Sequence, residues 1–314
     1  MGKNFDIDRS ETRPSADTAD SNTRPPNWFE KLAELADLAD LAPLAVPPKV
    51  AANSALPEIK VDATPAQIER TISNGTSKLD YAALLSGDRR VIFIGERHDD
   101  LAQKDEIINQ LHNLKTKGGL THVALEMLND ADMPAVQKYF EGSGDRQTVL
   151  NRLKARWSVA PGVPEKYMDF IDAIKKEKLI PLALDRTRRG GDDHGGSLYE
   201  ARNEHWAQVV GDALNAFPKA KVLVYSGRDH VGYTASTNET EAHTNEILQK
   251  DYGKKSTVVL LASPLDKEGS LSLHVSQAAK AAQPAACTAA FALKISKEQS
   301  SRPADFVVLP SPRE

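Results

Sequence analysis

Four apolar segments of this 314-residue chain are each followed at once by acidic, basic or imidazole side chains. These are Glu96 and His98 after the first segment, Glu126 after the second, Asp185 and Arg186 after the third, and Arg228 and His230 after the fourth. Carboxylates and imidazoles transfer protons or bind metal ions, and guanidinium groups stabilise developing negative charge. The sequence therefore offers the side chains of a hydrolytic site, provided that the fold brings them together.

The four apolar segments have the length and continuous hydrophobicity of strands that are buried on both faces of a parallel sheet. They span residues 91–95, 122–127, 179–185 and 221–227, and a fifth segment spans 257–262. In an open parallel sheet, ligands bind just beyond the carboxyl ends of the strands. The polar residues that follow the segments are therefore expected on one edge of the sheet, where they form a single site.

Helical patterns alternate with the predicted strands, which indicates an α/β fold with a mostly parallel central sheet and helices on both faces. The predicted helices cover residues 64–73, 80–85, 100–117, 132–140, 145–155, 164–178, 198–217 and 239–250. Two further short strands are expected at 271–275 and 305–309.

The N-terminal part of the chain differs in composition from the rest. Residues 1–26 are polar and poor in large apolar side chains, which is typical of disorder. Leucine recurs at every third position within residues 28–41, which predicts a short amphipathic helix that either packs on its own domain or docks a partner. Prolines interrupt residues 42–63 and indicate a linker. We therefore expect a tail over residues 1–60 and an α/β domain over residues 61–314.

The composition argues against several classes of protein. The net charge of −4 and the pI near 6.1 disfavour nucleic-acid binding, which requires a basic surface. Cys287 is the single cysteine, so the chain can form neither an intrachain disulfide nor a thiolate metal cage. No apolar run of about 18 residues predicts a transmembrane helix, and no cleavable signal peptide is recognisable. The expected location is the cytoplasm, or outside it after export without a cleaved signal peptide.

The candidate residues suffice for a hydrolytic site without a metal. His98 or Glu96 could serve as general base for a water molecule, and Glu126 could orient that water. The remaining candidates are a second imidazole, a further carboxylate, and an arginine that could stabilise an oxyanion: His230, Asp185, and Arg228 or Arg186. Arg202 lies within a predicted helix, where it is either a site residue or a surface charge.

The same residue types also suit a divalent metal. Glu96, His98, Glu126 and His230 would then be ligands of Zn, Mn or Fe, with a water molecule in the open position. The residue types alone leave both possibilities open. A serine hydrolase, a dinucleotide enzyme and an ATPase are disfavoured, because the chain lacks their glycine-rich motifs.

Short motifs at the strand ends resemble a known family. Gly95-Glu96-Arg97-His98-Asp99 resembles the Gly-Glu-x-His-Asp motif of the ChaN-like haem-binding family, and residues 124–127 and 181–185 resemble that family's second and third strand ends. Residues 227–230 are similar to the Gly-x-x-His motif of the wider superfamily, which includes erythromycin esterases and the TIKI/TraB proteases. The resemblance extends over residues 80–310 and implies an α/β fold with a polar pocket at the strand ends.

The resemblance also implies haem or iron binding, for which Tyr199 and Tyr233 are candidate ligands because tyrosine can coordinate haem iron. Two features separate this chain from particular relatives. ChaN-like bacterial lipoproteins carry a signal and a lipid-attachment cysteine, and neither is recognisable here. In erythromycin esterases two residues separate the glutamate from the histidine, whereas Arg97 alone does so here, which disfavours macrolide esterase activity.

Three functional hypotheses follow. The first is a hydrolase that cleaves an ester or amide bond in a small molecule or peptide, with or without a divalent metal. The second is a haem- or iron-binding protein of the ChaN type. The third is a secreted, effector-like interaction protein whose residues 1–60 are a secretion or docking segment, with docking through residues 28–41.

Overall fold

The computed structural model describes residues 53–75, 77–187, 198–232, 242–282, 290–296 and 303–311. All of them belong to one compact unit, Leu41–Glu314. Four features expected from the sequence lie outside the described part of the chain: the polar segment 1–26, the leucine-rich segment 28–41, Tyr233, and the side chain of Tyr199.

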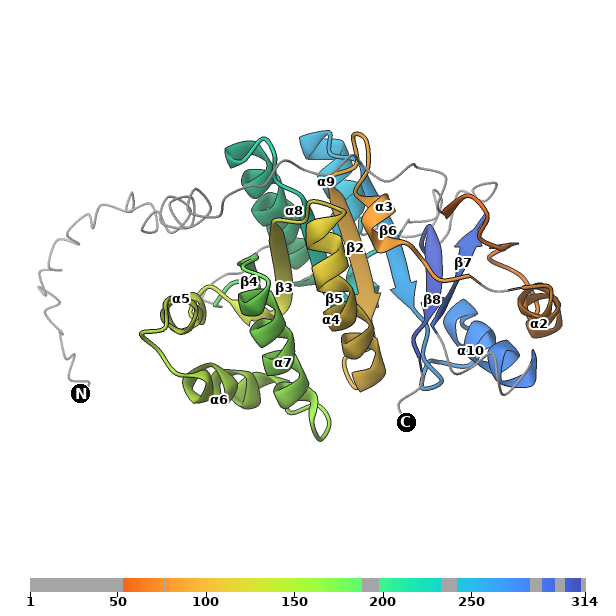
Figure 1. Ribbon diagram of the computed structural model, residues 1–314, viewed down its shortest axis with the longest axis horizontal. Helices are drawn as coiled ribbons and strands as arrows, with labels where there is room; N and C mark the ends of the chain where they lie inside the picture. The colour runs from red at the N-terminus through yellow and green to blue at the C-terminus, as the bar shows by residue number, and fades with distance from the viewer. Residues whose placement is uncertain are drawn as a thin grey trace, which may run out of the picture. The chain divides into compact units, whose positions relative to one another are not determined.

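A single sheet of eight strands forms the centre of the described unit (Figure 1). In the order in which they lie side by side, the strands are β1 (Glu58–Ile59), β7 (Phe291–Ile295), β8 (Phe306–Leu309), β6 (Ser256–Leu261), β2 (Val91–Glu96), β5 (Val222–Gly227), β3 (His122–Asn129) and β4 (Ile180–Asp185). All neighbouring strands are parallel except β7 and β8. The mostly parallel sheet predicted from the sequence is therefore confirmed.

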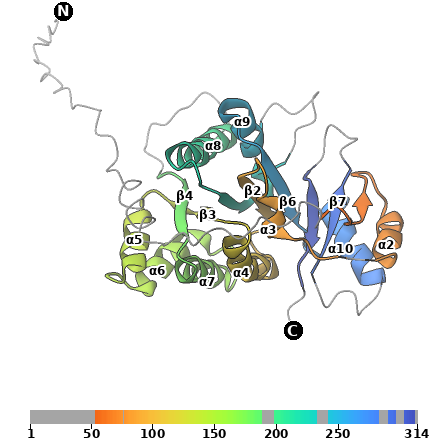
Figure 2. The same ribbon diagram turned by 45° about the horizontal axis from the view of Figure 1, so that its top comes forward.

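Helices cover both faces of this sheet, as the alternating pattern predicts. Figure 2 shows α8 (Leu198–Ala216) and α9 (Thr244–Tyr252) on one face, and α4 (Leu101–Thr116), α6 (Arg146–Trp157) and α7 (Val163–Lys176) on the other. The remaining helices are α2 (Pro65–Ser73), α3 (Tyr81–Leu84), α5 (Met133–Glu141), α10 (Leu271–Ala282) and the short 3-10 helix η2 (Arg228–His230). None of the helices within the described residues is long and apolar enough to cross a membrane.

The strand order places the four polar strand ends beside one another. Strands β2, β5, β3 and β4 are consecutive neighbours, although they follow the chain order β2, β3, β4, β5. All six residues of β2 and of β5 are buried, and Glu96 pairs in register with Gly227. Because these strands are parallel, their carboxyl ends form one edge, where the polar residues meet.

Three elements differ from the sequence-based predictions. The strand predicted at residues 271–275 is wrong, because these residues begin helix α10, whose buried positions Ser272, Val275, Ser276 and Ala279 follow a helical spacing. A short apolar run does not by itself distinguish a strand from a helix. Strands β1 and β7 have no predicted counterpart. Strand β1 pairs with β7, so the sheet includes residues of the segment expected to be a linker. The strand predicted at 305–309 is confirmed as β8.

Candidate active site

Glu96, the last residue of β2, is the centre of a buried polar cluster. Its side chain is 1% exposed and accepts hydrogen bonds on both oxygens. Oε1 accepts from the Tyr167 hydroxyl at 2.6 Å and lies 3.0 Å from His98 Nδ1. Oε2 accepts from Lys104 Nζ and from the Tyr225 hydroxyl, each at 2.6 Å. Four donors, from α7, α4, β5 and the turn that follows β2, therefore surround this carboxylate.

This environment keeps Glu96 ionised. Burial alone would raise its pKa, but the charge of Lys104 and the hydrogen bond and charge of His98 outweigh burial, so that the pKa is lowered from 4.5. Burial and the neighbouring Glu96 charge raise the pKa values of Tyr167 and Tyr225 well above 10. Both tyrosines therefore remain protonated hydrogen-bond donors to a fixed anion.

His98 is the member of the Glu96 group that reaches solvent, with 32% of its side chain exposed. Its Nδ1 lies 3.0 Å from Glu96 Oε1 and 3.1 Å from the Tyr167 hydroxyl oxygen. Because the Tyr167 proton points to Glu96, both oxygens accept from Nδ1, which assigns the ring proton to Nδ1 and leaves Nε2 as an acceptor. The Trp157 ring packs edge-on against the imidazole at 4.9 Å.

The pKa of His98 is raised above 6.5. Burial acts in the opposite direction, but the hydrogen bond to Glu96 and the charges of Glu126 and Glu96 together outweigh burial and the repulsion from Lys104. A raised pKa moves the charge change of a histidine from its usual range toward neutral pH, where the group can exchange protons.

Glu126 of β3 lies on the other side of the His98 ring. Its Oε2 accepts a 2.6 Å hydrogen bond from the Gly227 amide, and its Oε1 accepts one of 2.8 Å from Arg202 Nη2. The Nε2 atoms of His98 and His230 each lie 3.9 Å from Oε1. Burial raises the pKa of Glu126 above 4.5, although the charges of His98 and Arg202 oppose this effect. Two imidazoles thus flank one carboxylate oxygen.

Arg202, on the first turns of α8, connects Glu126 to the end of β4. Its Nε and Nη2 donate to Asp185 at 3.1 and 3.0 Å, and its Nη1 lies 3.3 Å from His230 Nε2. Trp206, one turn further along α8, donates from Nε1 to the same Asp185 carboxylate at 3.0 Å. Asp185 is therefore the residue that anchors Arg202 beside the two imidazoles.

His230 is held as a neutral imidazole. Its Nδ1 lies 2.8 Å from the Asn203 side-chain oxygen, and its Nε2 faces the Arg202 guanidinium. Burial, followed by the charges of Arg202 and His98, lowers its pKa to about 3. The ring packs on Trp206 at 4.3 Å. The two site histidines therefore have opposite pKa shifts, although both adjoin Glu126.

The structure thus brings together five of the residues singled out from the sequence: Glu96, His98, Glu126, Asp185 and His230. Arg202, for which the sequence left a surface charge as the alternative, joins them. Arg228 makes its contacts elsewhere. Its guanidinium forms an ion pair with Asp266 and donates to the Ser272 hydroxyl and the Leu261 carbonyl, next to helix α10.

The expected metal site is not supported by this arrangement. Within the described residues, no group of three or more His, Cys, Asp or Glu side chains is arranged to hold a metal ion. Three of the expected ligands, Glu96, Glu126 and His230, direct electron pairs at protein donors instead. Lys104 occupies the cation position beside Glu96, and Arg202 occupies the one between Glu126 and His230. Two basic side chains therefore supply the positive charge that a metal would bring.

Several residues of the cluster were not among the sequence candidates: Lys104, Tyr167, Asn203, Trp206 and Tyr225. For Lys104 the sequence contained a signal, because it lies on the same helical face as Ile107, Leu111 and Leu114, where a lysine is unusual unless it is paired. Tyr225 lies two residues before Gly227 in a buried strand, so its hydroxyl needs a partner. The other three lie within helices whose orientation the sequence does not give.

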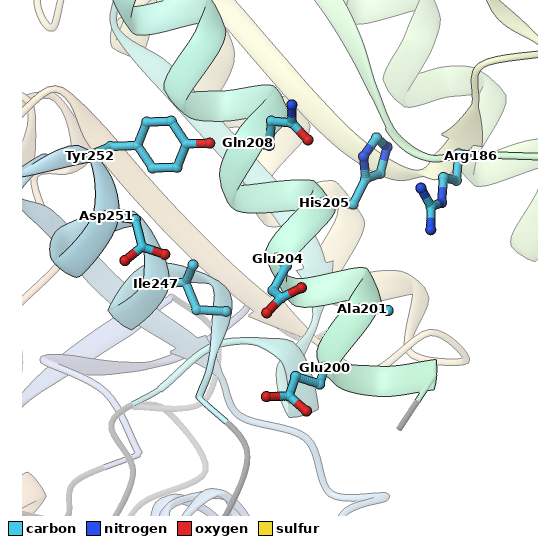
Figure 3. Close-up of a pocket in the computed structure, with 9 residues that line it drawn as sticks. All are labelled: Arg186, Glu200, Ala201, Glu204, His205, Gln208, Ile247, Asp251 and Tyr252. Atoms are coloured by element: carbon cyan, nitrogen blue, oxygen red, sulfur yellow. The ribbon is translucent and has the colours of Figure 1, made fainter. Parts of the chain in front are cut away.

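A groove of about 520 Å³ lies beside helix α8, on another side of the helix from the cluster (Figure 3). It is lined by Arg186, Glu200, Ala201, Glu204, His205 and Gln208, and by Ile247, Asp251 and Tyr252 of α9. Arg186, an oxyanion candidate from the sequence, thus lines this groove. Helix α8 presents one set of side chains to the groove and another set, Arg202, Asn203 and Trp206, to the cluster.

The buried neutral histidines predict a stability that falls in acid. Burial lowers the folded-state pKa of His122 to about 4 and that of His230 to about 3, both below the unfolded value of 6.5. Between these limits the unfolded chain binds more protons, so stability is full above pH 6.5 and falls as the pH decreases. Each histidine should cost on the order of 2 kcal/mol at pH 5.

This expectation can be checked with urea unfolding at pH 7 and pH 5. The difference in unfolding free energy between the two pH values should be smaller in His122→Gln than in the wild type by about 2 kcal/mol. His112→Gln is the control, because the His112 side chain is 74% exposed. Equal pH dependence in the wild type and His122→Gln would show that His122 titrates normally in the folded state.

Comparisons with curated proteins and with solved structures gave different results. No curated protein matches the chain. Among solved structures, a Bacillus cereus protein is 11% identical and covers 80% of this chain and 100% of its own, with a TM-score of 0.48. The type III effector HopBA1 is 15% identical (78% and 94% covered, TM-score 0.46), and ChaN of Campylobacter jejuni is 15% identical (72% and 89% covered, TM-score 0.38).

A family model also matches part of the chain. Residues 85–190 match the family described as haem-binding uptake, Tiki superfamily, ChaN. This segment contains Glu96, His98, Glu126 and Asp185, together with Lys104 and Tyr167. The resemblance predicted from the strand-end motifs is thereby confirmed: over residues 85–190, the chain matches the ChaN family of the Tiki superfamily.

Proposed function

We propose that this protein is a hydrolase that cleaves an ester or amide bond with water as the nucleophile. The observation that carries this proposal is the pair formed by Glu96 and His98. A buried carboxylate holds Nδ1 of a partly exposed imidazole at 3.0 Å, so that Nε2 is left as a proton acceptor at the carboxyl edge of the sheet. A carboxylate–imidazole pair of this kind is the arrangement by which enzymes activate a hydroxyl group or a water molecule.

Water is favoured as the nucleophile by the surroundings of His98. Within the described residues, the side chains placed against the ring nitrogens are those of Glu96, Tyr167 and Glu126, and none is a serine or a cysteine. The Nε2 atom and Glu126 Oε1 are 3.9 Å apart, which is too long for a direct hydrogen bond but allows one water molecule to contact both.

The reaction then needs two proton transfers. His98 Nε2 takes a proton from the water as its oxygen attacks the substrate carbonyl, and Glu126 stabilises the imidazolium. When the tetrahedral intermediate collapses, the same proton moves from Nε2 to the leaving oxygen or nitrogen, and the bond to the acyl carbon breaks. His98 is returned to its neutral form, so no further proton donor is required.

Arg202 is the residue that we assign to the oxyanion. Its guanidinium has five N–H groups, and its contacts within the described residues account for four of them, directed to Asp185 twice, Glu126 and His230. One N–H of Nη1 remains to donate to a substrate, and the side chain is 33% exposed. Asp185 and Trp206 hold the group in place, which reduces the reorganisation that charge stabilisation would otherwise require.

The test is hydrolysis of a panel of aryl esters and peptide amides by the purified full-length protein. We expect activity in the wild type and none above background in the double variant His98→Ala/Glu126→Ala. The control double variant is His112→Ala/Glu177→Ala, which removes an imidazole–carboxylate pair of 3.1 Å outside the cluster. Loss of activity in the control as well, or equal activity in all three proteins, would contradict the proposal.

The family match over residues 85–190 supports haem binding as a second candidate function. The described cluster does not suit haem, because Glu126 Oε1 lies 3.9 Å from His98 Nε2, where the porphyrin of a coordinated haem would need space. Haem ligation is therefore assigned to Tyr199 and Tyr233, the candidates from the sequence. Titration with haem should produce a shifted Soret band that Tyr199→Phe/Tyr233→Phe removes and His98→Ala retains. No spectral change at micromolar haem would exclude this candidate.

A further inference from the structure

We propose that Lys104 is a positioning residue of the site, which holds Glu96 as an anion directed at His98 Nδ1 and thereby keeps His98 Nε2 as the proton acceptor. This role of Lys104 in catalysis rests on the hydrolytic function proposed above. Its physical content, a dependence of His98 on Lys104 through Glu96, is a property of the folded protein that can be measured without a substrate.

Lys104 is fully buried, and its ammonium group lies among oxygen atoms only. Nζ is 2.6 Å from Glu96 Oε2 and 2.8 Å from the backbone carbonyl of His98, and it also lies 3.3 Å from the Asp100 carbonyl and 3.5 Å from that of Arg97. One ammonium therefore contacts the carboxylate at the end of β2 and three carbonyls of the turn that follows. It fixes the backbone that carries His98 as well as the carboxylate that orients its ring.

The other donors to Glu96 cannot replace this charge. Tyr167 and Tyr225 are neutral hydroxyl donors, and the fourth donor is His98 itself. Lys104 is thus the one permanent cation among the donors described around Glu96. A carboxylate buried without a compensating charge takes up a proton instead. Removal of the ammonium is therefore expected to neutralise Glu96, even though three hydrogen bonds to it remain.

A neutral Glu96 would bind His98 Nδ1 more weakly than the carboxylate does. A protonated carboxyl group no longer stabilises an imidazolium, and its oxygen is a weaker acceptor for the Nδ1 proton. The groups that face the His98 ring are Glu96 on β2, Glu126 on β3, Lys104 on α4 and Tyr167 on α7. Of these, Glu96 makes the charge-assisted hydrogen bond, so its charge state should dominate the behaviour of the ring.

The start and the buried face of helix α4 position Lys104 beside Glu96. The Asp100 side chain caps the helix by accepting from the Ala102 amide at 3.0 Å, which places Lys104 in the first turns, directly beneath the end of β2. The Lys104 stem lies on the buried face with Ile107, Leu111 and Leu114, and Nζ is 4.8 Å from the Tyr167 ring centre. Apolar packing of the stem thus aims the ammonium at Glu96.

The test measures the pKa of His98 by NMR titration of its ring, assigned by comparison with His98→Asn. Two explanations predict opposite signs. If Lys104 acts through Glu96, Lys104→Met should lower the pKa of His98 by about 1 unit or more, because Glu96 becomes neutral. If Lys104 is only a nearby cation, its removal ends a repulsion and the pKa of His98 should rise.

The Glu96→Gln background makes the distinction sharper. Glu96→Gln should itself lower the pKa of His98, and the addition of Lys104→Met should then raise the pKa, because only the direct repulsion is left to remove. Lys104→Arg should keep most of the wild-type value, and the control Lys166→Met, which removes a lysine paired with Asp105 and Asp169, should leave the pKa unchanged.

Folding is monitored by near-ultraviolet circular dichroism for each variant. If Lys104→Met does not fold, Lys104→Gln tests the same effect with a milder change, since it removes the charge beside Glu96 but keeps a polar side chain, and it should also lower the pKa of His98. A rise or no change in a folded Lys104→Met protein would overturn the proposal. The expected fall in pKa without hydrolysis of any substrate would support the role of Lys104 and contradict the proposed reaction.

Discussion

Replacement of His98 by asparagine is expected to lower kcat/KM for the best substrate of the panel by about 10²- to 10⁴-fold, the usual contribution of a general base. The reason is that asparagine occupies the same place and can still bond Glu96, but it has no atom that accepts a proton from water. The folded state should persist, because a third of the His98 side chain is exposed and little packing is lost. Initial rates and thermal unfolding of the wild type and the variant measure the two effects.

The control is His112→Asn, which removes an imidazole that contacts Glu177 away from the cluster. The pH dependence gives an additional check. Because unprotonated His98 is the active form, wild-type kcat/KM should rise with pH and level off above the raised pKa of His98. Equal rates for His98→Asn and the wild type, or a rate that falls as the pH rises through neutrality, would contradict the assignment of His98 as the base.

Gly227→Ala should abolish most of the activity and change stability little. A Cβ at this position would lie 2.9 Å from His98 Nε2 and 3.1 Å from Cε1, so it would occupy the space in front of the proposed base. The backbone itself tolerates alanine, because Gly227 has φ −55° and ψ 141°. We expect a decrease in kcat/KM of at least about 10²-fold, in line with the loss of a correctly placed general base.

Gly95→Ala is the matched comparison for this variant. A Cβ at Gly95 would lie 2.5 Å from Leu260 Cδ2 and 2.8 Å from Val231 Cγ2, within the packed core rather than at His98. Its main effect should therefore be on stability, with overpacking costing about 1–3 kcal/mol. Urea unfolding and initial rates of both variants separate the two effects. A Gly227→Ala protein with wild-type activity would show that the space beside His98 Nε2 is not used by the reaction.

The two histidines of the cluster differ in their environments and therefore in the direction of their pKa shifts. His98 adjoins two carboxylates and is partly exposed, so its pKa is raised, whereas His230 is buried against Arg202 and has a pKa of about 3. Opposite shifts in neighbouring titratable groups indicate different roles. His98 is fitted to exchange a proton, and His230 is fitted to accept a hydrogen bond from Arg202 without acquiring charge.

Much of the architecture followed from the sequence. The continuous apolar runs that end at Glu96, Asp185 and Gly227 predicted buried parallel strands, because only residues that face helices on both sides of a sheet can be apolar without alternation. Once the strands are parallel, their carboxyl ends must share an edge. That the polar strand ends share one edge was therefore a consequence of local pattern, whereas their adjacency on that edge depends on the strand order.

Other features depended on contacts that no local pattern records. Strand β1 consists of Glu58 and Ile59 and pairs with β7, which lies more than 230 residues further along the chain. A strand of this length is too short to give a periodic signal in the sequence. The apolar run that starts at Leu271 could satisfy either a strand or a helix, and packing within the tertiary structure made it helical. Where a local sequence is compatible with two conformations, tertiary contacts determine which one is adopted.

The same division applies to the cluster around Glu96. The sequence by itself determined that Glu96, His98, Glu126 and Asp185 lie on one edge of a mostly parallel sheet, because that placement depends only on strand direction. The tertiary structure decided their chemistry. Lys104 and Arg202 come from helices, and the rotation of each helix about its axis is set by the packing of its whole apolar face. That packing placed two cations where a metal was expected, and so made Glu96 a fixed anion and His98 the proposed base.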